Sequence, residues 1–446
     1  MYDVLILGAG PAGYVAAEHA GTLGKKVLLV EKERLGGVCL NCGCIPTKSF
    51  LNAAKLYDHA LHSGVFGVAV AGATFDYGVM KARTAKVQDT LRNGIAAMLK
   101  KNKVEVVTGA ATVIDKNTVE VNGQSYQCAN LLIASGGSPA LPPIPGLADN
   151  PAVVDSTGVL NAGTLAESIV IIGGGVIGIE FACFFSLLSK QVTVVEMLPQ
   201  ICGATDNEIA VSVQRRLEAK GVKIHTGAKV EKIEGNTVLF TDKAGAAQSA
   251  TAELILAATG RAANLTGLGL EKLNLDMDRR HIKVNERAQT SLPGVYAAGD
   301  VTGRWQLAHF ASRQGVVAVN NMFGHDDICR ECAIPSVIYT DPEVASVGLT
   351  EALAKEKGLE ARTLKMMLGA SGRFLAETEG VRGFVKAVVG ARGELLGMHV
   401  VGPYASEMIG AACVMIENEM RAGDIAQIVF PHPTVAEIMK EIMALA

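Results

Sequence analysis

Two stretches of the chain show the same order of apolar and polar positions. Each begins with a short apolar strand, which is followed by a glycine-rich turn, a helix of small residues and a second apolar strand. These parts fall at residues 3–7, 8–13, up to about 24 and 26–30 in the first stretch, and at 168–172, 173–178, up to about 189 and 191–195 in the second. A strand, a helix and a further strand in this order predict a βαβ unit with parallel strands. The pattern therefore predicts an α/β protein that contains this unit twice.

The glycine-rich turns match the G-x-G-x-x-G pattern of dinucleotide-binding folds. The first glycine makes a tight turn, the second lets the backbone approach a pyrophosphate, and the third lets helix and strand pack closely. Each unit ends in an acid, Glu31 or Glu196, which can bind a ribose diol. Glycines that only pack are the alternative for either turn alone, whereas the matched pair favours two Rossmann-like domains. The motif glycines are Gly8, Gly10, Gly13, Gly173, Gly175 and Gly178.

The pattern changes at about residue 334. Spaced strands and amphipathic helices follow, which is typical of an α+β domain. Its helices are rich in methionine, which would suit an oligomer interface, although ordinary core is the more frequent use. The strands are expected at 337–339, 383–389 and 395–401, the helices at 406–420 and 435–445, and the methionines are Met408, Met415, Met420, Met439 and Met443. Prolines mark a boundary near residue 145, and we predict three regions: 1–145 with 264–332, 146–263, and 333–446.

Composition excludes several classes of protein. Among 446 residues, 49% are hydrophobic and 19% charged, which indicates a globular chain. The net charge of −3 and the lack of a polybasic tract argue against a nucleic-acid partner. The uncharged stretch 131–148 contains several prolines, so no membrane span is expected. A strand that starts near residue 3 leaves no room for a signal peptide, so we expect a cytoplasmic protein.

Three of the nine cysteines cluster directly after the first unit. Cys39 and Cys44 could form a small disulfide loop, but Cys39 and Cys42 form a C-x-x-C pair that is also a plausible redox pair. A zinc site that adds Cys329 and Cys332 is a weaker alternative, because tight ligand spacings usually come as two clean pairs. Cys329 and Cys332 are more simply interpreted as a surface pair of incidental thiols. No metal is therefore expected.

Two elements resemble those of the pyridine nucleotide-disulfide oxidoreductases, flavoenzymes of the glutathione reductase class. They are GGVCLNCGCIPTK at 36–48 and TSLPGVYAAGD at 290–300. The resemblance covers the whole chain and implies that Cys39 and Cys44 form the redox disulfide. Cys42 stands where the family usually has an aliphatic residue. By the same resemblance, 1–145 with 264–332 bind FAD and form the central domain, 146–263 bind a nicotinamide nucleotide, and 333–446 form the interface domain.

The resemblance also implies further cofactor contacts. Lys48 and Glu180 would pair near the reactive edge of the flavin, where a positive charge stabilises the reduced form. A structural salt bridge is the alternative for that pair. No arginine pair follows Glu196 to hold a 2′-phosphate, which favours NAD over NADP. The remaining implied cofactor-binding residues are Ala111, Gly136, Asp300, Ala308, Val230 and Gly260.

A histidine near the C-terminus is the last candidate for chemistry. Thr434 and Glu437 have the spacing of a capping box, which alone favours a bystander role for His432. The resemblance instead implies that His432 is the acid/base of dithiol chemistry and that Glu437 orients its imidazole. It also places this histidine opposite the disulfide of another subunit, so a homodimer is implied. Departures from the family pattern are Phe430-Pro431 and Gly137.

Several short runs are similar to the branch of the family that reoxidises protein-bound dihydrolipoamide with NAD⁺. They lie at 13–17, 306–309, 334–343 and 402–407. No cysteine follows Cys413, so the C-terminal thiol pair of mercuric reductase is missing. The implied partner is the lipoyl domain of a 2-oxo acid dehydrogenase acyltransferase or a glycine cleavage lipoyl protein. A sister reductase with another disulfide substrate and a non-catalytic flavoprotein component remain as alternatives.

Overall fold

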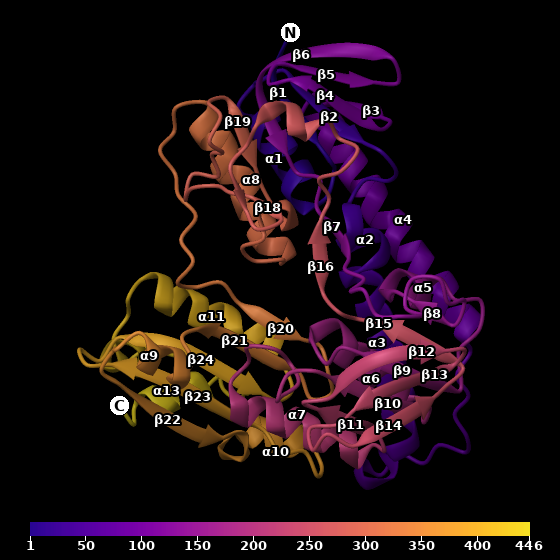
Figure 1. Ribbon diagram of the computed structural model, residues 1–446. Helices are drawn as coiled ribbons and strands as arrows, with labels where there is room; N and C mark the ends of the chain where they lie inside the picture. The colour runs from indigo at the N-terminus through magenta and orange to yellow at the C-terminus, as the bar shows by residue number, and fades with distance from the viewer. The chain divides into compact units, whose positions relative to one another are not determined.

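The chain passes repeatedly between two structural units. A computed structural model describes residues 1–446, and its internal contacts separate the two units shown in Figure 1. Unit 1 contains Met1–Ser49, Gly78–Ala140 and Gly260–Arg330, and unit 2 contains Phe50–Tyr77, Leu141–Thr259 and Glu331–Ala446. Each of the two predicted βαβ stretches lies within one unit. The finer division into three regions stays a prediction.

A mixed sheet forms the centre of unit 1. The strands of this unit are β1 (Tyr2–Leu7), β2 (Val27–Glu31), β3 (Glu105–Thr108), β4 (Ala111–Asp115), β5 (Thr118–Val121), β6 (Gln124–Ile133), β7 (Gly137–Pro139), β16 (Arg261–Ala263), β17 (Met277–Asp278), β18 (His281–Ile282) and β19 (Val295–Ala297). The sheet order is β3-β2-β1-β6-β5-β4, and β19 also pairs with β6. β1 is parallel to both β2 and β6, as the first apolar pattern predicts. Its last four residues are buried, because parallel strands are covered on both faces.

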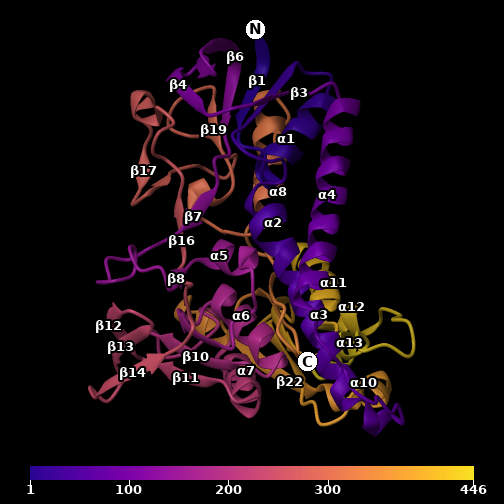
Figure 2. The same cartoon turned by 90° about the vertical axis from the view of Figure 1, so that its right-hand side faces the viewer.

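Helices cover this sheet and carry the thiol cluster. They are α1 (Pro11–Thr22), α2 (Gly37–Cys42), α4 (Tyr77–Lys101), α8 (Ala308–Met322), η2 (Leu270–Leu273) and η3 (Asp300–Thr302). α1 packs against α8 at close range, since a Cβ on Gly315 would lie 2.4 Å from the Ala12 carbonyl oxygen. Figure 2 shows the long α4 beside α2. Helix α3 (Cys44–His62) is shared, because it begins in unit 1 and continues into unit 2.

The second predicted stretch forms a five-stranded parallel sheet in unit 2. Its order is β11-β10-β9-β15-β8. The segment between β11 and β15 forms a separate small antiparallel sheet of order β12-β13-β14. Helix α6 is buried from Gly178 to Leu187, so it is covered on all sides. The elements are η1 (Ser63–Phe66), β8 (Val153–Val154), α5 (Ser156–Asn161), β9 (Ser168–Ile172), α6 (Val176–Leu187), β10 (Gln191–Glu196), α7 (Asn207–Ala219), β11 (Lys223–Thr226), β12 (Lys229–Glu234), β13 (Thr237–Thr241), β14 (Ala247–Thr251) and β15 (Leu254–Ala257).

The C-terminal region of unit 2 is the predicted α+β fold. An antiparallel sheet of order β20-β21-β24-β23-β22 packs against α11 and α13. The elements are β20 (Ser336–Ile338), β21 (Val344–Gly348), α9 (Glu351–Glu356), β22 (Ala361–Met367), η4 (Leu368–Ala370), α10 (Gly372–Glu377), β23 (Phe384–Gly390), β24 (Leu395–Val401), α11 (Ala405–Glu417), α12 (Ala422–Ala426) and α13 (Ile438–Met443). The α/β fold class with a C-terminal α+β region is therefore confirmed.

The methionines of this region serve the core and not an exposed interface. Met408, Met415, Met439 and Met443 are buried in the cluster between the sheet and its helices, and Met420 packs against that cluster. Of the two uses considered for these methionines, ordinary core is therefore the one observed. A flexible thioether fills irregular gaps between a sheet and short helices, which explains their use here.

A buried lysine joins the C-terminal sheet to α7. Lys386 of β23 is 4% exposed and donates to Asp206, 7% exposed, at 2.8 Å. Asp206 also caps α7, because its other oxygen accepts the backbone N–H of Glu208 at 3.0 Å. We expect Lys386→Ala to cost about 3–5 kcal/mol of stability, since it leaves a buried carboxylate without its cation. Denaturant unfolding would measure this loss, with the exposed Lys357→Ala as control. A change no larger than that of the control would contradict the prediction.

The buried thiol of Cys183 makes stability depend on alkaline pH. Burial in α6 raises the pKa of Cys183 from 9.0 to about 12. The unfolded chain then releases this proton at a lower pH than the folded chain, so stability that is full below pH 9 falls as pH rises toward 12. We expect the melting temperature of Cys183→Ala to fall less steeply over that range than that of the wild type. The exposed Cys332→Ala is the control, and equal slopes for all three proteins would contradict the prediction.

Candidate active site

The thiols of Cys39 and Cys44 meet at the junction of two helices. Cys39 lies within α2, Gly43 follows that helix, and Cys44 begins α3. The side-chain hydrogen bond with Cys44 and then burial raise the pKa of Cys39, while the charge of Lys48 opposes them. Two adjacent sulfurs do not both ionise readily, so the pair titrates as a unit. The neighbouring thiol thus holds the pKa of Cys39 above its ordinary value.

Helix α2 is attached directly to the first glycine-rich turn. The backbone N–H of Gly36 donates to the carbonyl of Ala9 at 2.8 Å. Gly37 has φ 58°, and a Cβ on it would lie 2.6 Å from the Cα of Gly10. Only glycine permits this close approach in a left-handed conformation. The thiol pair is consequently held beside the turn that is predicted to bind a dinucleotide.

Side chains of α4 hold α2 in place. The amide of Gln88 donates to the carbonyl oxygens of Leu40 and Asn41 at 3.1 and 2.7 Å. Arg92 donates to the side-chain oxygen of Asn41 at 2.7 Å. The two Gln88 bonds satisfy backbone carbonyl groups that a short helix leaves without partners at its end. Sequence reasoning missed Gln88 and Arg92, because neither belongs to a motif and both lie far along the chain from α2.

The two glycine-rich turns have the same geometry. A Cβ on Gly13 would lie 1.8 Å from the carbonyl oxygen of Gly8, and one on Gly178 would lie 2.0 Å from that of Gly173. The third glycine of each motif therefore lets the helix pack against the turn, as predicted. Gly8 and Gly173 have φ 99° and 106°, which L side chains rarely adopt. The folding role of these glycines follows from this geometry.

The acids at the ends of the second strands close each turn. Glu31 accepts the backbone N–H of Ala9 at 2.8 Å and that of Glu33 at 2.9 Å. In unit 2, Glu196 accepts the backbone N–H groups of Gly174 and Leu198 at 2.5 and 2.6 Å. A carboxylate has about four acceptor positions, so each acid keeps capacity for ribose hydroxyls. Both acids thus have a structural role beside their proposed ribose contact.

The space in front of the second turn fits a pyrophosphate. A Cβ on Gly175 would meet no protein atom within 4 Å, and Gly175 has φ −72°, so nothing in the protein requires glycine there. The N-terminus of α6 directs its N–H groups into that space, and such a terminus favours a phosphate. The glycine is explained if a ligand occupies the position that a Cβ would fill. Gly10 is similarly open, because its nearest contact would be Gly37 at 3.9 Å.

This difference between glycines gives a matched pair of variants. We expect Gly175→Ala to raise the KM for NAD⁺ at least about 10-fold, because a methyl group displaces the pyrophosphate, with an unchanged melting temperature. Gly178→Ala should instead lower the melting temperature, since its Cβ would overlap the Gly173 carbonyl oxygen. Steady-state kinetics and thermal unfolding check both variants. An unchanged KM in a folded Gly175→Ala protein would rule out the proposed cradle.

The other predicted cofactor residues lie at strand ends and turns. Ala111 begins β4, Gly136 follows β6, Asp300 begins η3, Ala308 begins α8, Val230 lies in β12 and Gly260 follows β15. Asp300 forms a 3.1 Å ion pair with Arg261, which also donates to the carbonyl of Gly137. A Cβ on Gly137 would lie 2.8 Å from the Ala262 carbonyl oxygen, which explains this departure from the family's usual serine. The cofactor contacts of these residues stay proposals.

Lys48 and Glu180 belong to different units. Lys48 lies on the first turns of α3 in unit 1, where it affects the Cys39 thiol. Glu180 lies in α6 of unit 2, is 3% exposed, and accepts the backbone N–H of Tyr339 at 3.0 Å. Their mutual ion pair stays a prediction.

His432 and Glu437 form a hydrogen-bonded pair in unit 2. The Nδ1 atom of His432 lies 2.9 and 3.2 Å from the two carboxylate oxygens of Glu437. The backbone N–H of Thr434, and then His432, hold the pKa of Glu437 below its ordinary value. An ionised carboxylate only accepts, so Nδ1 is the donor and Nε2 is left as the basic atom. The capping box forms in part, since Thr434 N–H donates to Glu437 at 2.8 Å, and α13 begins only at Ile438.

The second cysteine pair is not a surface pair. Cys329 is 6% exposed, and its backbone N–H donates to the carbonyl of Glu286 in unit 1. Cys332 is exposed, and its thiol donates to Glu417 at 3.5 Å in unit 2. The interpretation of both as surface thiols is therefore wrong for Cys329. Its backbone is bonded to a segment some forty residues earlier, a contact that local sequence does not reveal.

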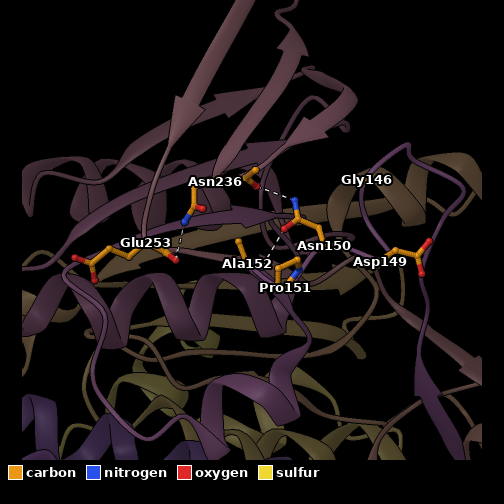
Figure 3. A pocket seen from close by; sticks show the side chains of 8 residues that line it. Gly146, Asp149, Asn150, Pro151, Ala152, Asn236 and Glu253 are labelled. Atoms are coloured by element: carbon orange, nitrogen blue, oxygen red, sulfur yellow. Dashed lines mark hydrogen bonds between the residues drawn. The ribbon is translucent and has the colours of Figure 1, made fainter.

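A hollow of about 720 Å³ in unit 2 is lined by none of the predicted site residues. Figure 3 shows Asn150 and Asn236 at its wall. Both side chains form hydrogen bonds within the protein. Asn150 donates to the carbonyl of Gly235 at 2.7 Å, and Asn236 donates to that of Ala252 at 3.0 Å. These two asparagine side chains thus serve the structure, and none of the residues that line the hollow was predicted to take part in the chemistry.

No helix of the structure combines the length and apolar character that crossing a bilayer requires.

Comparison with known proteins agrees with this geometry. Residues 2–315 match the pyridine nucleotide-disulphide oxidoreductase family, and 334–443 match the dimerisation domain of that family. Dihydrolipoyl dehydrogenase of Geobacillus stearothermophilus is 39% identical, with 100% of this chain and 96% of the relative covered. The Mycoplasma pneumoniae enzyme of the same name is 38% identical, with coverages of 99% and 97%.

Solved structures show the same fold over the whole chain. LpdA from Mycobacterium tuberculosis has a TM-score of 0.90 at 26% identity, with 99% of each chain covered. RclA from Escherichia coli, described as an HOCl-induced flavoprotein disulfide reductase, has a TM-score of 0.88 at 27% identity, with 100% of each chain covered. The resemblance first noted at residues 36–48 and 290–300 is confirmed. The chain therefore belongs to the pyridine nucleotide-disulphide oxidoreductase family.

Proposed function

We propose that this chain oxidises protein-bound dihydrolipoamide and passes the electron pair through a Cys39–Cys44 disulfide and FAD to NAD⁺. The observation that carries the proposal is the attachment of the thiol helix α2 to the first glycine-rich turn through Gly36 and Gly37. A thiol pair beside the turn that binds a flavin dinucleotide can exchange electrons with that flavin. The relatives at 38–39% identity support the substrate, because both are named dihydrolipoyl dehydrogenase.

The protein's own residues divide the thiol chemistry between them. His432 takes a proton from one substrate thiol, and the resulting thiolate attacks the sulfur of Cys39, which breaks the bond to Cys44. The second substrate sulfur then displaces Cys39 and closes the ring of lipoamide. One substrate proton ends on Cys39 and the other on His432, while Cys44 bears the negative charge. Bound FAD and NAD⁺ supply the two-electron acceptance that restores the disulfide.

We propose a homodimer in the cytoplasm as the working form. The side chain of His432 is 78% exposed in one chain, so a second copy can cover it. Val429 and Val414, within the part that matches the dimerisation domain, are 91% and 60% exposed, and apolar side chains of this kind favour burial at an interface. A reducing compartment keeps the redox pair available for turnover.

The decisive experiment is NAD⁺-dependent oxidation of dihydrolipoamide by the purified protein. We expect a yellow protein that turns over free dihydrolipoamide, and faster turnover when the lipoyl group is attached to a lipoyl domain. Domains from a 2-oxo acid dehydrogenase acyltransferase and from a glycine cleavage lipoyl protein should be tested separately. Inactivity with dihydrolipoamide together with NADPH-linked reduction of another disulfide would assign the chain to a sister reductase. A colourless protein would contradict the flavin chemistry.

A further inference from the structure

A third thiol lies within the redox element and has no part in the chemistry above. Cys42 is the last residue of α2, three positions after Cys39 and two before Cys44. All three side chains are partly exposed. Side chains three positions apart lie on the same face of a helix. Cys42 therefore points along the face that carries Cys39.

The i, i+3 spacing of Cys39 and Cys42 on a helix exceeds that of a disulfide by an ångström or two. In a regular helix, Cβ atoms at this spacing are about 5–6 Å apart, whereas a disulfide needs about 3.5–4.5 Å. Helix α2 has only six residues and ends at Gly43, which has φ −144°. The last turn of a helix readily tightens toward 3₁₀ geometry, which brings such side chains closer together. A small tightening of this turn is all that bond formation requires.

The surroundings favour Cys44 as the sulfur that leaves. Cys44 is the first residue of the 19-residue helix α3, whose N-terminal dipole stabilises a thiolate. Lys48 follows one turn later on the same helix, and its positive charge acts on the adjacent Cys39 thiol. Other ionisable groups around the cluster are Tyr14 of α1, which interacts with Cys39, and Asp89 and Arg92 of α4.

We propose that Cys42 is a third redox-active thiol that exchanges with the Cys39–Cys44 disulfide. The thiolate of Cys42 attacks the sulfur of Cys39, a Cys39–Cys42 bond forms, and the Cys39–Cys44 bond breaks to release Cys44 as a thiolate. The number of electrons in the three sulfurs is unchanged, so no external oxidant is needed. The net proton released is the one that Cys42 loses. The inference rests on the proposed function, because it takes Cys39–Cys44 as the starting disulfide.

The exchange gives the oxidised protein a second disulfide form, with a Cys39–Cys42 bond, which we call the parked state. In that state Cys44 is a reduced thiolate while the oxidising equivalents are stored in the Cys39–Cys42 bond. Return of the bond to Cys44 restores the proposed catalytic disulfide. Because the exchange releases a proton, the ratio of parked to starting disulfide should rise by up to about tenfold per pH unit below the ordinary cysteine pKa of about 8.5.

Differential labelling of the oxidised protein tests the exchange. Unreacted thiols are blocked with N-ethylmaleimide, the disulfide is then reduced and labelled with iodoacetamide, and trypsin releases residues 35–48 with all three cysteines. We expect maleimide mainly on Cys42 and a minor fraction on Cys44 that grows between about pH 6 and pH 8. The fraction on Cys44 should vanish in Cys42→Ser and persist in Cys413→Ser, the matched control. Maleimide on Cys42 alone at every pH would overturn the proposal.

A second variant forces the alternative bond. With Cys44→Ser, oxidised glutathione should produce an intramolecular Cys39–Cys42 disulfide, with loss of both thiols and no retained glutathione. A stable glutathione adduct on Cys39 would overturn the proposal. Failure of the proposed function has a different signature, because the wild-type peptide would then lack a Cys39–Cys44 disulfide or the protein would not oxidise dihydrolipoamide.

Discussion

Replacement of Cys44 by serine is expected to lower kcat for dihydrolipoamide oxidation by at least about 10³-fold. A hydroxyl group forms no disulfide with Cys39, so the Cys39–Cys44 bond is lost, and a Cys39–Cys42 bond formed in its place leaves no thiolate at position 44. The proposed thiolate on Cys44 is lost as well, because serine does not ionise in this pH range. Steady-state assay with saturating NAD⁺ measures the effect.

Two controls separate this loss from a folding defect. Cys413→Ser removes another partly exposed thiol and should leave turnover near the wild-type value. The melting temperature and flavin content of Cys44→Ser should also match the wild type, since serine is nearly isosteric with cysteine. Substantial turnover of dihydrolipoamide by a folded, flavin-containing Cys44→Ser protein would disprove the role of the Cys39–Cys44 pair.

Replacement of His432 by glutamine is expected to lower kcat/KM by about 10²–10⁴-fold. The imidazole offers a basic Nε2 while Nδ1 donates to Glu437 at 2.9 Å. An amide can keep a hydrogen bond to Glu437 but takes no proton from a thiol. Glu437→Gln should cost less, because the imidazole remains and only its orientation and charge stabilisation weaken. The measurement is kcat/KM for dihydrolipoamide, and an unchanged value for His432→Gln would remove it from the chemistry.

The pH dependence of wild-type activity gives a further check. The lowered pKa of Glu437 keeps its carboxylate ionised as pH falls past the ordinary range of glutamate. Its contribution to the pair is therefore present above that range and lost only at more acidic pH. Wild-type activity should not fall with the ordinary titration of a glutamate near pH 4.5. An activity loss centred there would contradict an ionised Glu437 carboxylate beside His432.

Coexpression of these two variants tests the arrangement of subunits. If His432 acts on the disulfide of the other subunit, a mixed dimer of Cys44→Ser and His432→Gln chains has one intact site of its two. Activity should then reappear in the mixed dimer although each variant alone is inactive. If His432 acts within its own chain, no intact site forms, and the mixed dimer would stay inactive.

The sequence by itself determined the parts of this protein that depend on local chemistry. Strands 168–172 and 395–401 have the predicted bounds, because apolar runs with turn residues at their ends specify strands locally. The two G-x-G-x-x-G turns, the thiol element at 36–48 and the His432–Glu437 spacing are also local. Each of these signals is carried by residues that lie within a few positions of one another.

Tertiary structure alone decided how those parts are held. Gln88 and Arg92 reach α2 across more than forty residues, and Lys386 reaches Asp206 across 180. Such contacts arise when elements distant in the chain bury their apolar faces together, and no periodicity encodes which polar groups then meet. The same packing placed the methionines in the core and buried Cys329. Local pattern thus specified the reactive groups, while long-range packing set the positions from which they act.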